Sequence, residues 1–410
     1  MAIKRGAKLV ISAEVRNRFI LGRQGLWPGR RWQGKKGVEQ AIHELGFVQI
    51  DPTTIVAPSQ DIVLWGRVLD YQPAYLNDLL YKERKFFDYG GNLRVLPMPE
   101  LPYWRIVMKR KGQEKRWAKF AKENKKLIAD VKARARRQGP VRNRDFEGKQ
   151  TKNYRSGRDS GVALYYLWLT GELMISHREG KERVYDLLEK LVPDQYSRKA
   201  TSKEAEDFFA QKSVAVHGIL NLRTFRNTWK GFIERFVDRK EAEKKLKQMV
   251  SAGTIQEVGI EKERDSFYIF PKDLPLLESL AAQKILKAWQ PLDTTTTEEV
   301  VFLSPLDSIT GKAKTLFNFD TVWEIYKPSH KRKYGPYTMP ILYGENLVGR
   351  ADFQLDRARK TLVINGVWLE DWFSPTRQFS KAFSRGLENF VAFLGADAVD
   401  SSTTESQAFL

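Results

Sequence analysis

Two copies of a helix-helix-hairpin pattern lie in the middle of this chain, and they constrain its fold more than any other feature. In the first copy, an apolar helix over 160–169 is followed by two short strands on either side of the charged tip 177–182. In the second copy, helices that end at Val250 precede two strands on either side of the polar tip 261–265. Two helices followed by a hairpin with a charged tip are typical of a winged helix. The pattern therefore predicts tandem winged-helix (helix-turn-helix) units.

The two ends of the chain predict different kinds of structure. Residues 12–45 predict two helices, the first capped by Ser12 and the second ended by Gly46. These helices are a candidate third copy of the helix-helix-hairpin pattern, although the hairpin of that copy is not obvious. Beyond about Val300 the sequence becomes β-rich, before a last helix over 380–393. Strands are expected at 321–326, 337–342, 347–353 and 361–364. Short strands at this spacing favour a small barrel or a curled sheet.

Together these patterns predict an α+β fold, with tandem winged-helix domains and a C-terminal β-rich, barrel-like region. A chain of 410 residues is too long for one ordinary domain. The expected parts are an N-terminal helical or winged-helix unit (1–135), two winged-helix units (136–200 and 201–290), a β-rich region with the final helix (291–395) and a flexible tail (396–410).

Positive charge is concentrated in one part of the sequence. The formal net charge is +20, and residues 101–160 hold 20 Lys and Arg against 6 Asp and Glu, a difference of +14. An even spread would place only about +3 there. Clustered positive charge is the usual footprint of phosphate binding, because each neutralised phosphate releases condensed counterions. The charge therefore predicts a nucleic-acid partner, although a basic surface with no ligand would give the same count.

Composition also argues against several classes of chemistry. The chain has no Cys, which removes disulfides, thiolate catalysis and Cys-based zinc sites, and its four His are scattered without metal spacing. No glycine-rich phosphate loop is present, and neither a metal nor another cofactor is expected. No secretory signal follows the basic N-terminus, and no apolar run approaches the ~18 residues needed to span a bilayer. We therefore expect a cytoplasmic, nucleoid-associated protein without a membrane partner.

The candidate site for chemistry is the segment 47–56, which carries an amide and a carboxylate two residues apart. In an extended strand, Gln49 and Asp51 would share one face. Val48 and Ile50 would then point into the core. A carboxylate beside an amide can hold and polarise one water molecule, so hydrolysis within a nucleic acid becomes a hypothesis. A Gln-x-Asp sequence at a strand end is also common at a solvated sheet edge, and spacing alone does not separate the two interpretations.

Several stretches of the sequence carry recognisable motifs. They are Gln49-Ile50-Asp51 with Ile55-Val56-Ala57, Gly139-Pro140-Val141-Arg142 with Asp145-Phe146, Arg183-Val184-Tyr185-Asp186-Leu187, Leu303-Ser304-Pro305-Leu306-Asp307, Lys331-Arg332-x-Tyr334-Gly335, and Leu347-Val348-Gly349-Arg350-x-Asp352. Through these stretches, which keep their order over roughly residues 10–395, the chain resembles the AlkZ/YcaQ (AlkX) family of winged-helix bacterial DNA glycosylases. Its Gln-x-Asp motif is similar to that of the YcaQ branch, whereas the AlkZ branch has Gln-x-Gln.

The resemblance implies a monofunctional enzyme that hydrolyses the N-glycosidic bond of bulky N7-alkylated purines in double-stranded DNA, and it extends to enzymes that unhook interstrand crosslinks. Asp51 would activate water and stabilise the oxocarbenium-like sugar, while Gln49 would orient the water or the deoxyribose. Because an N7-alkylated base is a cationic leaving group, one carboxylate would suffice where glycoside hydrolases need two. A monomer is expected. The residues expected to contact DNA are Gly91, Asn92, Arg142, His177, Arg178, Lys331, Arg332, Lys333 and Tyr334.

The chain departs from the family at the stretch 89–93. Relatives of the YcaQ type carry a His-Glu pair where this chain has Gly91 and Asn92. Whether a proton shuttle or a lesion contact exists at this place in this chain is therefore an open question. The glycines of this stretch would let a DNA backbone approach closely, with Asn92 as a hydrogen-bonding contact. An ordinary Gly-Gly turn explains the same residues equally well.

Two other functions fit parts of the sequence. A non-catalytic winged-helix regulator of transcription explains the charge and the hairpins, but it leaves Gln49, Asp51 and the β-rich region without a role. A metal nuclease built on Asp51 and Asp61 would need more clustered carboxylates than the sequence offers.

Overall fold

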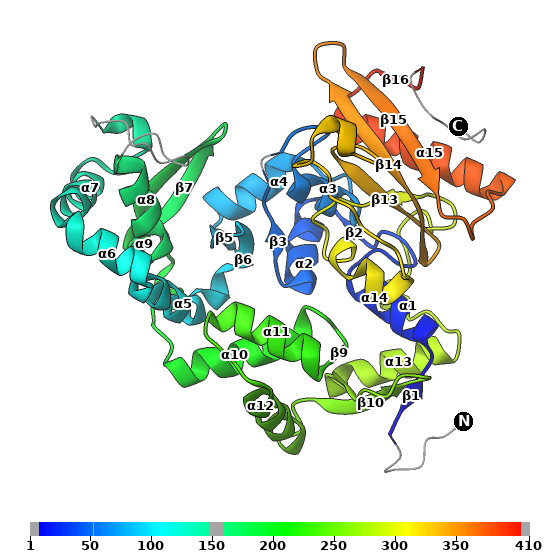
Figure 1. Ribbon diagram of the computed structural model, residues 1–410, viewed down its shortest axis with the longest axis horizontal. Coiled ribbons are helices and arrows are strands. Elements are labelled where there is room, and N and C mark those ends of the chain that lie inside the picture. The colour runs from blue at the N-terminus through cyan, green and yellow to red at the C-terminus, as the bar shows by residue number, and fades with distance from the viewer. Residues whose placement is uncertain (1–7, 52, 147–158, 403–410) are drawn as a thin grey trace. The chain divides into compact units, whose positions relative to one another are not determined.

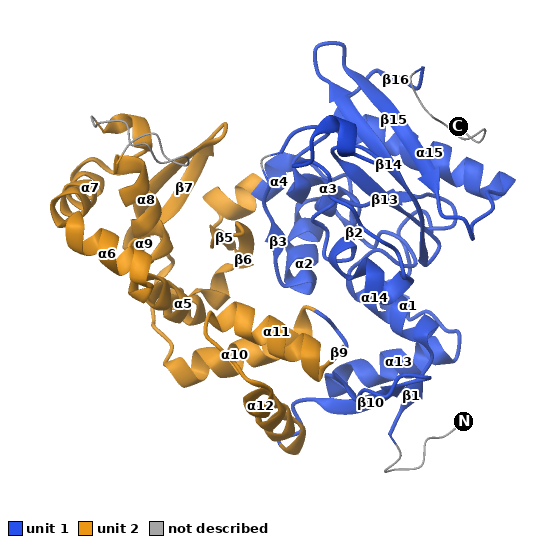
Figure 2. Ribbon diagram, viewed as in Figure 1, with its two compact units in different colours: residues 1–76, 217–219, 252–410 blue, residues 77–216, 220–251 orange. Residues whose placement is uncertain are grey.

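The computed structural model forms two compact units (Figures 1 and 2). The residues that it describes are 8–51, 53–146 and 159–402. Unit 1 comprises 1–76, 217–219 and 252–410, and unit 2 comprises 77–216 and 220–251. Both units combine helices with strands, so the predicted α+β class is confirmed, whereas the five-part division along the sequence stays a prediction.

The N-terminal part of unit 1 contains the two helices that its sequence predicts. Helix α1 (Ala13–Arg23) begins after Ser12, whose side chain accepts a hydrogen bond from the Val15 N–H at 3.2 Å. Helix α2 (Gly34–Leu45) ends at Gly46, which has the left-handed conformation (φ 77°) that favours glycine. The other elements here are β1 (Val10–Ile11), β2 (Trp32–Gln33), β3 (Val48–Gln49), α3 (Ser59–Trp65), β4 (Val68–Leu69) and α4 (Pro73–Asn77).

The C-terminal part of unit 1 is a curled sheet with a long helix packed against it (Figure 1). Its described strands run in the order β12-β13-β14-β15-β16, with antiparallel pairs except for the parallel pair β15-β16. Helix α15 (Arg377–Leu394) places Phe383 and Phe390 against Phe302 of the sheet. The strands are β12 (Val301–Phe302), β13 (Thr338–Tyr343), β14 (Asn346–Asp356), β15 (Thr361–Leu369) and β16 (Ala398–Asp400). Register shifts after Ile341 and Asp352 locally bend the sheet.

Most sequence predictions for this region are confirmed, but one is wrong. The strands near 337–342, 347–353 and 361–364 and the last helix are present. No strand forms over 321–326, because the buried Glu324 carboxylate binds the backbone of residues 333–335 and holds the segment as an irregular loop. Strand β16 lies within the tail that begins at residue 396, the flexibility of that tail stays a prediction, and residues 403–410 lie outside the described part.

A hydrophobic core joins the two parts of unit 1. It includes Phe19 of α1, Ile260, Leu277 and Val301, all of them buried. Other elements that contribute residues to this core are β10 (Gln256–Ile260), β11 (Phe267–Ile269), α13 (Leu274–Ala281) and α14 (Ala313–Phe317). Strands β10 and β11 form the antiparallel hairpin predicted for the second copy of the pattern.

Unit 2 is mainly helical, and its described part carries two antiparallel hairpins. These are β5 (Phe86–Tyr89) with β6 (Arg94–Pro97), and β7 (Leu173–Glu179) with β8 (Glu182–Leu187). The helices are α5 (Leu101–Gln113), α6 (Lys115–Glu123), α7 (Lys125–Gln138), α8 (Asp159–Leu169), α9 (Leu188–Leu191), α10 (Ser202–Ala215), α11 (Leu222–Ile233) and α12 (Arg239–Ser251), with the short strand β9 (Leu220–Asn221) between α10 and α11. Helix α8 and the β7-β8 hairpin are the predicted first copy, although a winged helix in the strict sense stays a prediction.

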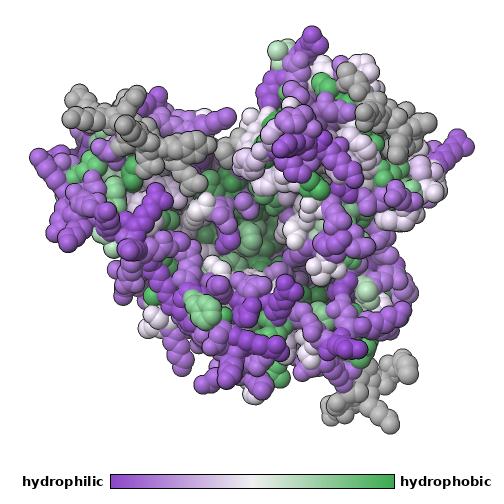
Figure 3. All heavy atoms as spheres, viewed as in Figure 1, coloured by the Kyte–Doolittle hydropathy of each residue, from purple (hydrophilic) through white to green (hydrophobic). Residues whose placement is uncertain are grey.

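The strongly basic segment forms helices where it is described. Residues 101–138 make up α5, α6 and α7, and the basic insertion at 147–158 lies outside the described residues. Hydrophilic residues cover most of the molecular face in Figure 3, as expected for a chain with 29% charged residues. Within the described ranges, no helix combines the length and apolar character needed to cross a membrane.

Candidate active site

The candidate carboxylate lies in unit 1, just beyond β3, and its own loop holds it in place. Asp51 Oδ1 accepts hydrogen bonds from the Thr53 N–H at 3.0 Å and from the Thr53 hydroxyl at 2.9 Å. The Asp51 N–H donates to Gln60 Oε1 at 3.2 Å. These contacts fix a half-buried carboxylate through one oxygen. The other oxygen, Oδ2, accepts no hydrogen bond from the residues that the structure describes.

The backbone around Asp51 differs from the extended strand that the sequence predicts. Strand β3 consists of Val48 and Gln49 alone, so Asp51 lies past its end and strand alternation does not set its direction. Val48 is buried as predicted, but Ile50 is only half-buried. Gln49 is half-buried at the end of β3. The position of Asp51 is therefore set by its hydrogen bonds with Thr53 and by the Gln60 side chain of α3, which accepts a hydrogen bond from the Asp51 N–H.

Tyr337 is a further candidate for this site that was not predicted from the sequence. It precedes β13, is 1% exposed, and donates its N–H to Asp352 Oδ1 at 2.9 Å. Its buried hydroxyl has no partner with good hydrogen-bond geometry among the described residues. The pKa of Tyr337 is raised to about 12, chiefly by burial and to a lesser extent by the negative charge of Asp51, while the Ser304 hydroxyl acts to lower it. A buried hydroxyl that lacks a hydrogen-bond partner suits a site that binds a polar ligand.

The Ser304–Asp307 motif contacts and stabilises helix α3, which contains Gln60. The hydroxyl oxygens of Ser304 and Ser59 lie 2.7 Å apart, and Ser59 begins α3. Asp307 accepts hydrogen bonds from Arg67 at 2.7 and 2.9 Å, and both side chains are fully buried. The Arg67 guanidinium also donates to two backbone carbonyls. This motif therefore stabilises the surroundings of Asp51 through a paired and fully hydrogen-bonded buried charge.

The basic loop Lys331–Gly335 is folded around a buried carboxylate. Glu324 accepts hydrogen bonds from the N–H groups of residues 333–335 at 2.8, 2.8 and 3.3 Å. Burial acts to raise the pKa of Glu324, but these hydrogen bonds outweigh it and lower the pKa to about 2. The side chains of Lys331 and Lys333 are exposed, and those of Arg332 and Tyr334 are half-buried. The charged carboxylate therefore fixes the backbone of a loop that presents two lysines to solvent.

The other predicted DNA contacts belong to unit 2, so only the Lys331–Tyr334 group shares a unit with Asp51. Gly91 and Asn92 are exposed in the turn between β5 and β6. A Cβ atom added at Gly91 would meet nothing within 4 Å, so this turn is open to an approaching molecule. His177 is half-buried on β7.

The two predicted arginine contacts of unit 2, Arg142 and Arg178, already form ion pairs within that unit. Arg178 is half-buried and donates to Asp88 at 2.5 Å and to the Tyr81 hydroxyl at 3.0 Å. Arg142 forms ion pairs with Asp145 and Glu179. Their charges are partly neutralised by these carboxylates, and their contact with DNA stays a prediction.

The described carboxylates and imidazoles do not gather into a metal-binding group. No cluster of three or more such side chains could hold an ion within the described ranges. Asp61 of α3 is buried and accepts a hydrogen bond from the Tyr71 hydroxyl at 2.6 Å. Burial raises the pKa of Asp61 to about 6, against the smaller lowering effect of Tyr71. Its contacts are those of a core residue.

Comparison with known proteins gives the class of this protein. A family model described as "DNA glycosylase AlkZ-like" matches residues 42–393. The chain therefore belongs to the AlkZ-like DNA glycosylase family, a family of DNA repair glycosylases whose partner is DNA. Among solved structures, the Streptomyces sahachiroi DNA glycosylase AlkZ matches with a TM-score of 0.63 and 13% identity, over 97% of this chain and 100% of that one. This likeness concerns the fold, and it supports the mixed α+β architecture with a curled C-terminal sheet.

Proposed function

We propose that this protein excises bulky N7-alkylated purines from double-stranded DNA as a monofunctional glycosylase. Family membership supports the reaction class. The observation that carries the proposal is the half-buried Asp51 carboxylate, which Thr53 fixes through Oδ1 while Oδ2 accepts no hydrogen bond from the described residues. The proposed substrates extend to interstrand crosslinks, which contain the same type of alkylated purine.

The proposed reaction is hydrolysis with one carboxylate. A water oxygen bonds to C1′ of the deoxyribose while the C1′–N9 bond breaks, and the bond electrons leave with the base. Because N7 alkylation has already made the base cationic, the base departs neutral and no general acid is needed. Asp51 stabilises the oxocarbenium-like sugar and takes the proton from the attacking water, and Gln49 orients the water or the sugar.

Tyr337 extends this proposal as a positioning residue. Its raised pKa keeps the hydroxyl protonated at neutral pH, so the group can donate a hydrogen bond. An acceptor bound near Asp51, such as the attacking water or a sugar oxygen, would supply the partner that the hydroxyl lacks among the described residues.

DNA binding is assigned to the basic loop of unit 1 and to the hairpins of unit 2. The exposed Lys331 and Lys333 suit phosphate contacts, and the open turn at Gly91 and Asn92 suits close approach of a DNA backbone. We propose that the winged-helix units and these residues together hold the duplex, and that the protein acts as a monomer.

One assay separates the proposed activity from its rivals. The protein is incubated with a duplex that contains a single N7-alkylguanine, in the presence of a chelator, and the no-enzyme reaction measures spontaneous loss of the base. A glycosylase releases free base and leaves a heat-labile abasic site. A regulator would shift the duplex on a gel without releasing base, and a metal nuclease would cut the strand only when the chelator is omitted.

A further inference from the structure

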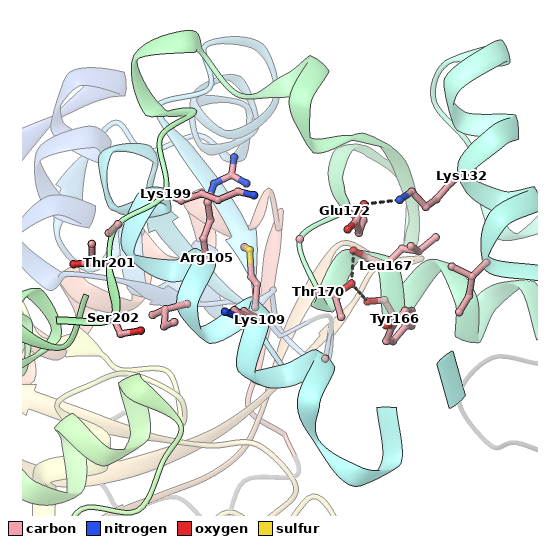
Figure 4. Close-up of a pocket in the computed structure, with 16 residues that line it drawn as sticks. Arg105, Lys109, Lys132, Tyr166, Leu167, Thr170, Glu172, Lys199, Thr201 and Ser202 are labelled. Atoms are coloured by element: carbon pink, nitrogen blue, oxygen red, sulfur yellow. Dashed lines mark hydrogen bonds and ion pairs between the residues drawn. The ribbon is translucent and has the colours of Figure 1, made fainter. Parts of the chain in front are cut away.

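A pocket in unit 2 lies outside the candidate active site and has a basic lining. It encloses about 620 Å³ between α5, α7, the end of α8 and the start of α10 (Figure 4). Pockets of this size are typical of small-molecule sites. The cationic residues that line it are Arg105, Lys109, Lys132 and Lys199.

Three of these cations have no partner among the described residues. Lys132 pairs with Glu172 at 2.7 Å, and Glu172 is the one carboxylate among the lining residues. No described residue forms an ion pair with Arg105, Lys109 or Lys199. The pocket therefore carries positive charge that the protein does not neutralise.

Arg105 gives the strongest indication that this pocket binds an anion. Its Nε atom is buried and has no hydrogen-bond acceptor among the described residues. Burial lowers the pKa of Arg105, and no carboxylate acts to raise it. A buried donor without an acceptor is costly, so an anion that supplied the acceptor would bind favourably.

The lining differs between the two ends of the pocket. Arg105 and Lys199 lie at the same end of the view as Thr201 and Ser202, whereas Tyr166 and Leu167 lie at the other end (Figure 4). The first turn of α10 is already capped, since Thr201 and Glu204 exchange hydrogen bonds between side chain and backbone. The anion-binding character therefore comes from the side chains of Arg105, Lys109 and Lys199 rather than from a helix end.

We propose that this pocket binds the phosphate group of a nucleotide. Arg105, Lys109 and Lys199 would contact the phosphate, whose oxygens supply several acceptors for the guanidinium and ammonium donors. Tyr166 and Leu167 would form an apolar wall for the attached base or sugar. The nucleotide is either a free mononucleotide or a residue of a DNA strand, which present the same phosphate chemistry. The inference does not depend on Asp51 or on base excision.

The test uses the full chain and two phosphate-bearing probes. Calorimetry measures binding of deoxyguanosine monophosphate, with deoxyguanosine and inorganic phosphate as comparison probes, and fluorescence anisotropy measures binding of an undamaged oligonucleotide. The double variant Arg105→Gln/Lys199→Gln should weaken binding of at least one phosphate-bearing probe about tenfold or more. The control Lys122→Gln/Lys126→Gln removes the same charge from exposed positions of α6 and α7, and should change affinity less than about twofold.

The pattern of losses identifies the source of the phosphate. A loss confined to the mononucleotide assigns the pocket to a free nucleotide, and a loss confined to the oligonucleotide assigns it to DNA. Equal affinities of the pocket variant and the control variant for both probes would overturn the proposal. It would also be overturned if deoxyguanosine, which lacks a phosphate, bound as tightly as deoxyguanosine monophosphate. Circular dichroism checks that the double variant is folded, and Lys109→Gln replaces it if it is not.

Discussion

Replacing Asp61 with Asn should remove a pH dependence from the free energy of unfolding. Asp61 is 7% exposed, and the Tyr71 hydroxyl binds it at 2.6 Å. Burial raises its pKa from the ordinary value of 3.8 to about 6. A carboxyl group whose pKa is raised by folding stabilises the folded state while it is protonated, below about pH 4, and this contribution is lost as the pH rises through about 6. At about 1.4 kcal/mol per pKa unit, the difference between the pKa of Asp61 in the folded protein and its ordinary value corresponds to ~3 kcal/mol of unfolding free energy.

The assay is denaturant unfolding of the wild type and of Asp61→Asn between about pH 4 and pH 8. The other ionisable groups titrate alike in both proteins, so the difference in unfolding free energy isolates Asp61. Asn has nearly the same volume and can still accept the hydrogen bond from Tyr71. We therefore expect nearly equal stabilities at about pH 4 and a variant more stable by up to ~3 kcal/mol at about pH 8. A difference that stays constant with pH would refute the reasoning.

Three further substitutions test contacts around the site. Tyr337→Phe removes the unpartnered hydroxyl and should slow single-turnover excision about tenfold without changing affinity for lesion-containing DNA, and an unchanged rate would exclude Tyr337 from the site. Asp307→Asn leaves the buried Arg67 charge uncompensated and should cost about 3–5 kcal/mol in urea unfolding, so a cost below about 1 kcal/mol would contradict the assigned role. Glu324→Gln removes a carboxylate whose contribution to stability is present above pH 4.5 and is lost as the pH falls through about 2, so thermal unfolding should show a loss at neutral pH that disappears near pH 2. An equal loss at both pH values would contradict this origin.

Much of the fold was predictable from local sequence patterns, in which residues close together in the chain determine the structure. Ser12 and Gly46 mark helix ends through contacts with their own helices, and both were located correctly. The hairpins β7-β8 and β10-β11 were also predictable, because each needs only two short β-prone segments and a charged or polar tip, whereas β5-β6 was not predicted. Strand prediction failed at 321–326, where β-branched and aromatic residues favour a strand but Glu324 binds backbone groups nine to eleven residues further along the chain.

The surroundings of the candidate site were much less predictable than the carboxylate itself. Asp51 was found through its motif, but its loop conformation depends on Thr53 and Gln60 rather than on strand alternation. The hydrogen bond between Ser59 and Ser304 joins residues 245 positions apart, and no local pattern encodes such a contact. Tyr337 carries no signal of its own in the sequence, because only burial without a hydrogen-bond partner makes its hydroxyl notable.

Single-turnover excision by Asp51→Asn tests the central claim most directly. The substrate is a duplex with one N7-alkylguanine, the readout is free base above spontaneous release, and Asp61→Asn is the matched control on the neighbouring carboxylate. The account predicts that Asp51→Asn slows excision by about 10²- to 10⁴-fold while lesion-DNA affinity stays within about twofold of wild type, and that Asp61→Asn keeps the wild-type rate. Excision by Asp51→Asn at the wild-type rate would contradict the account.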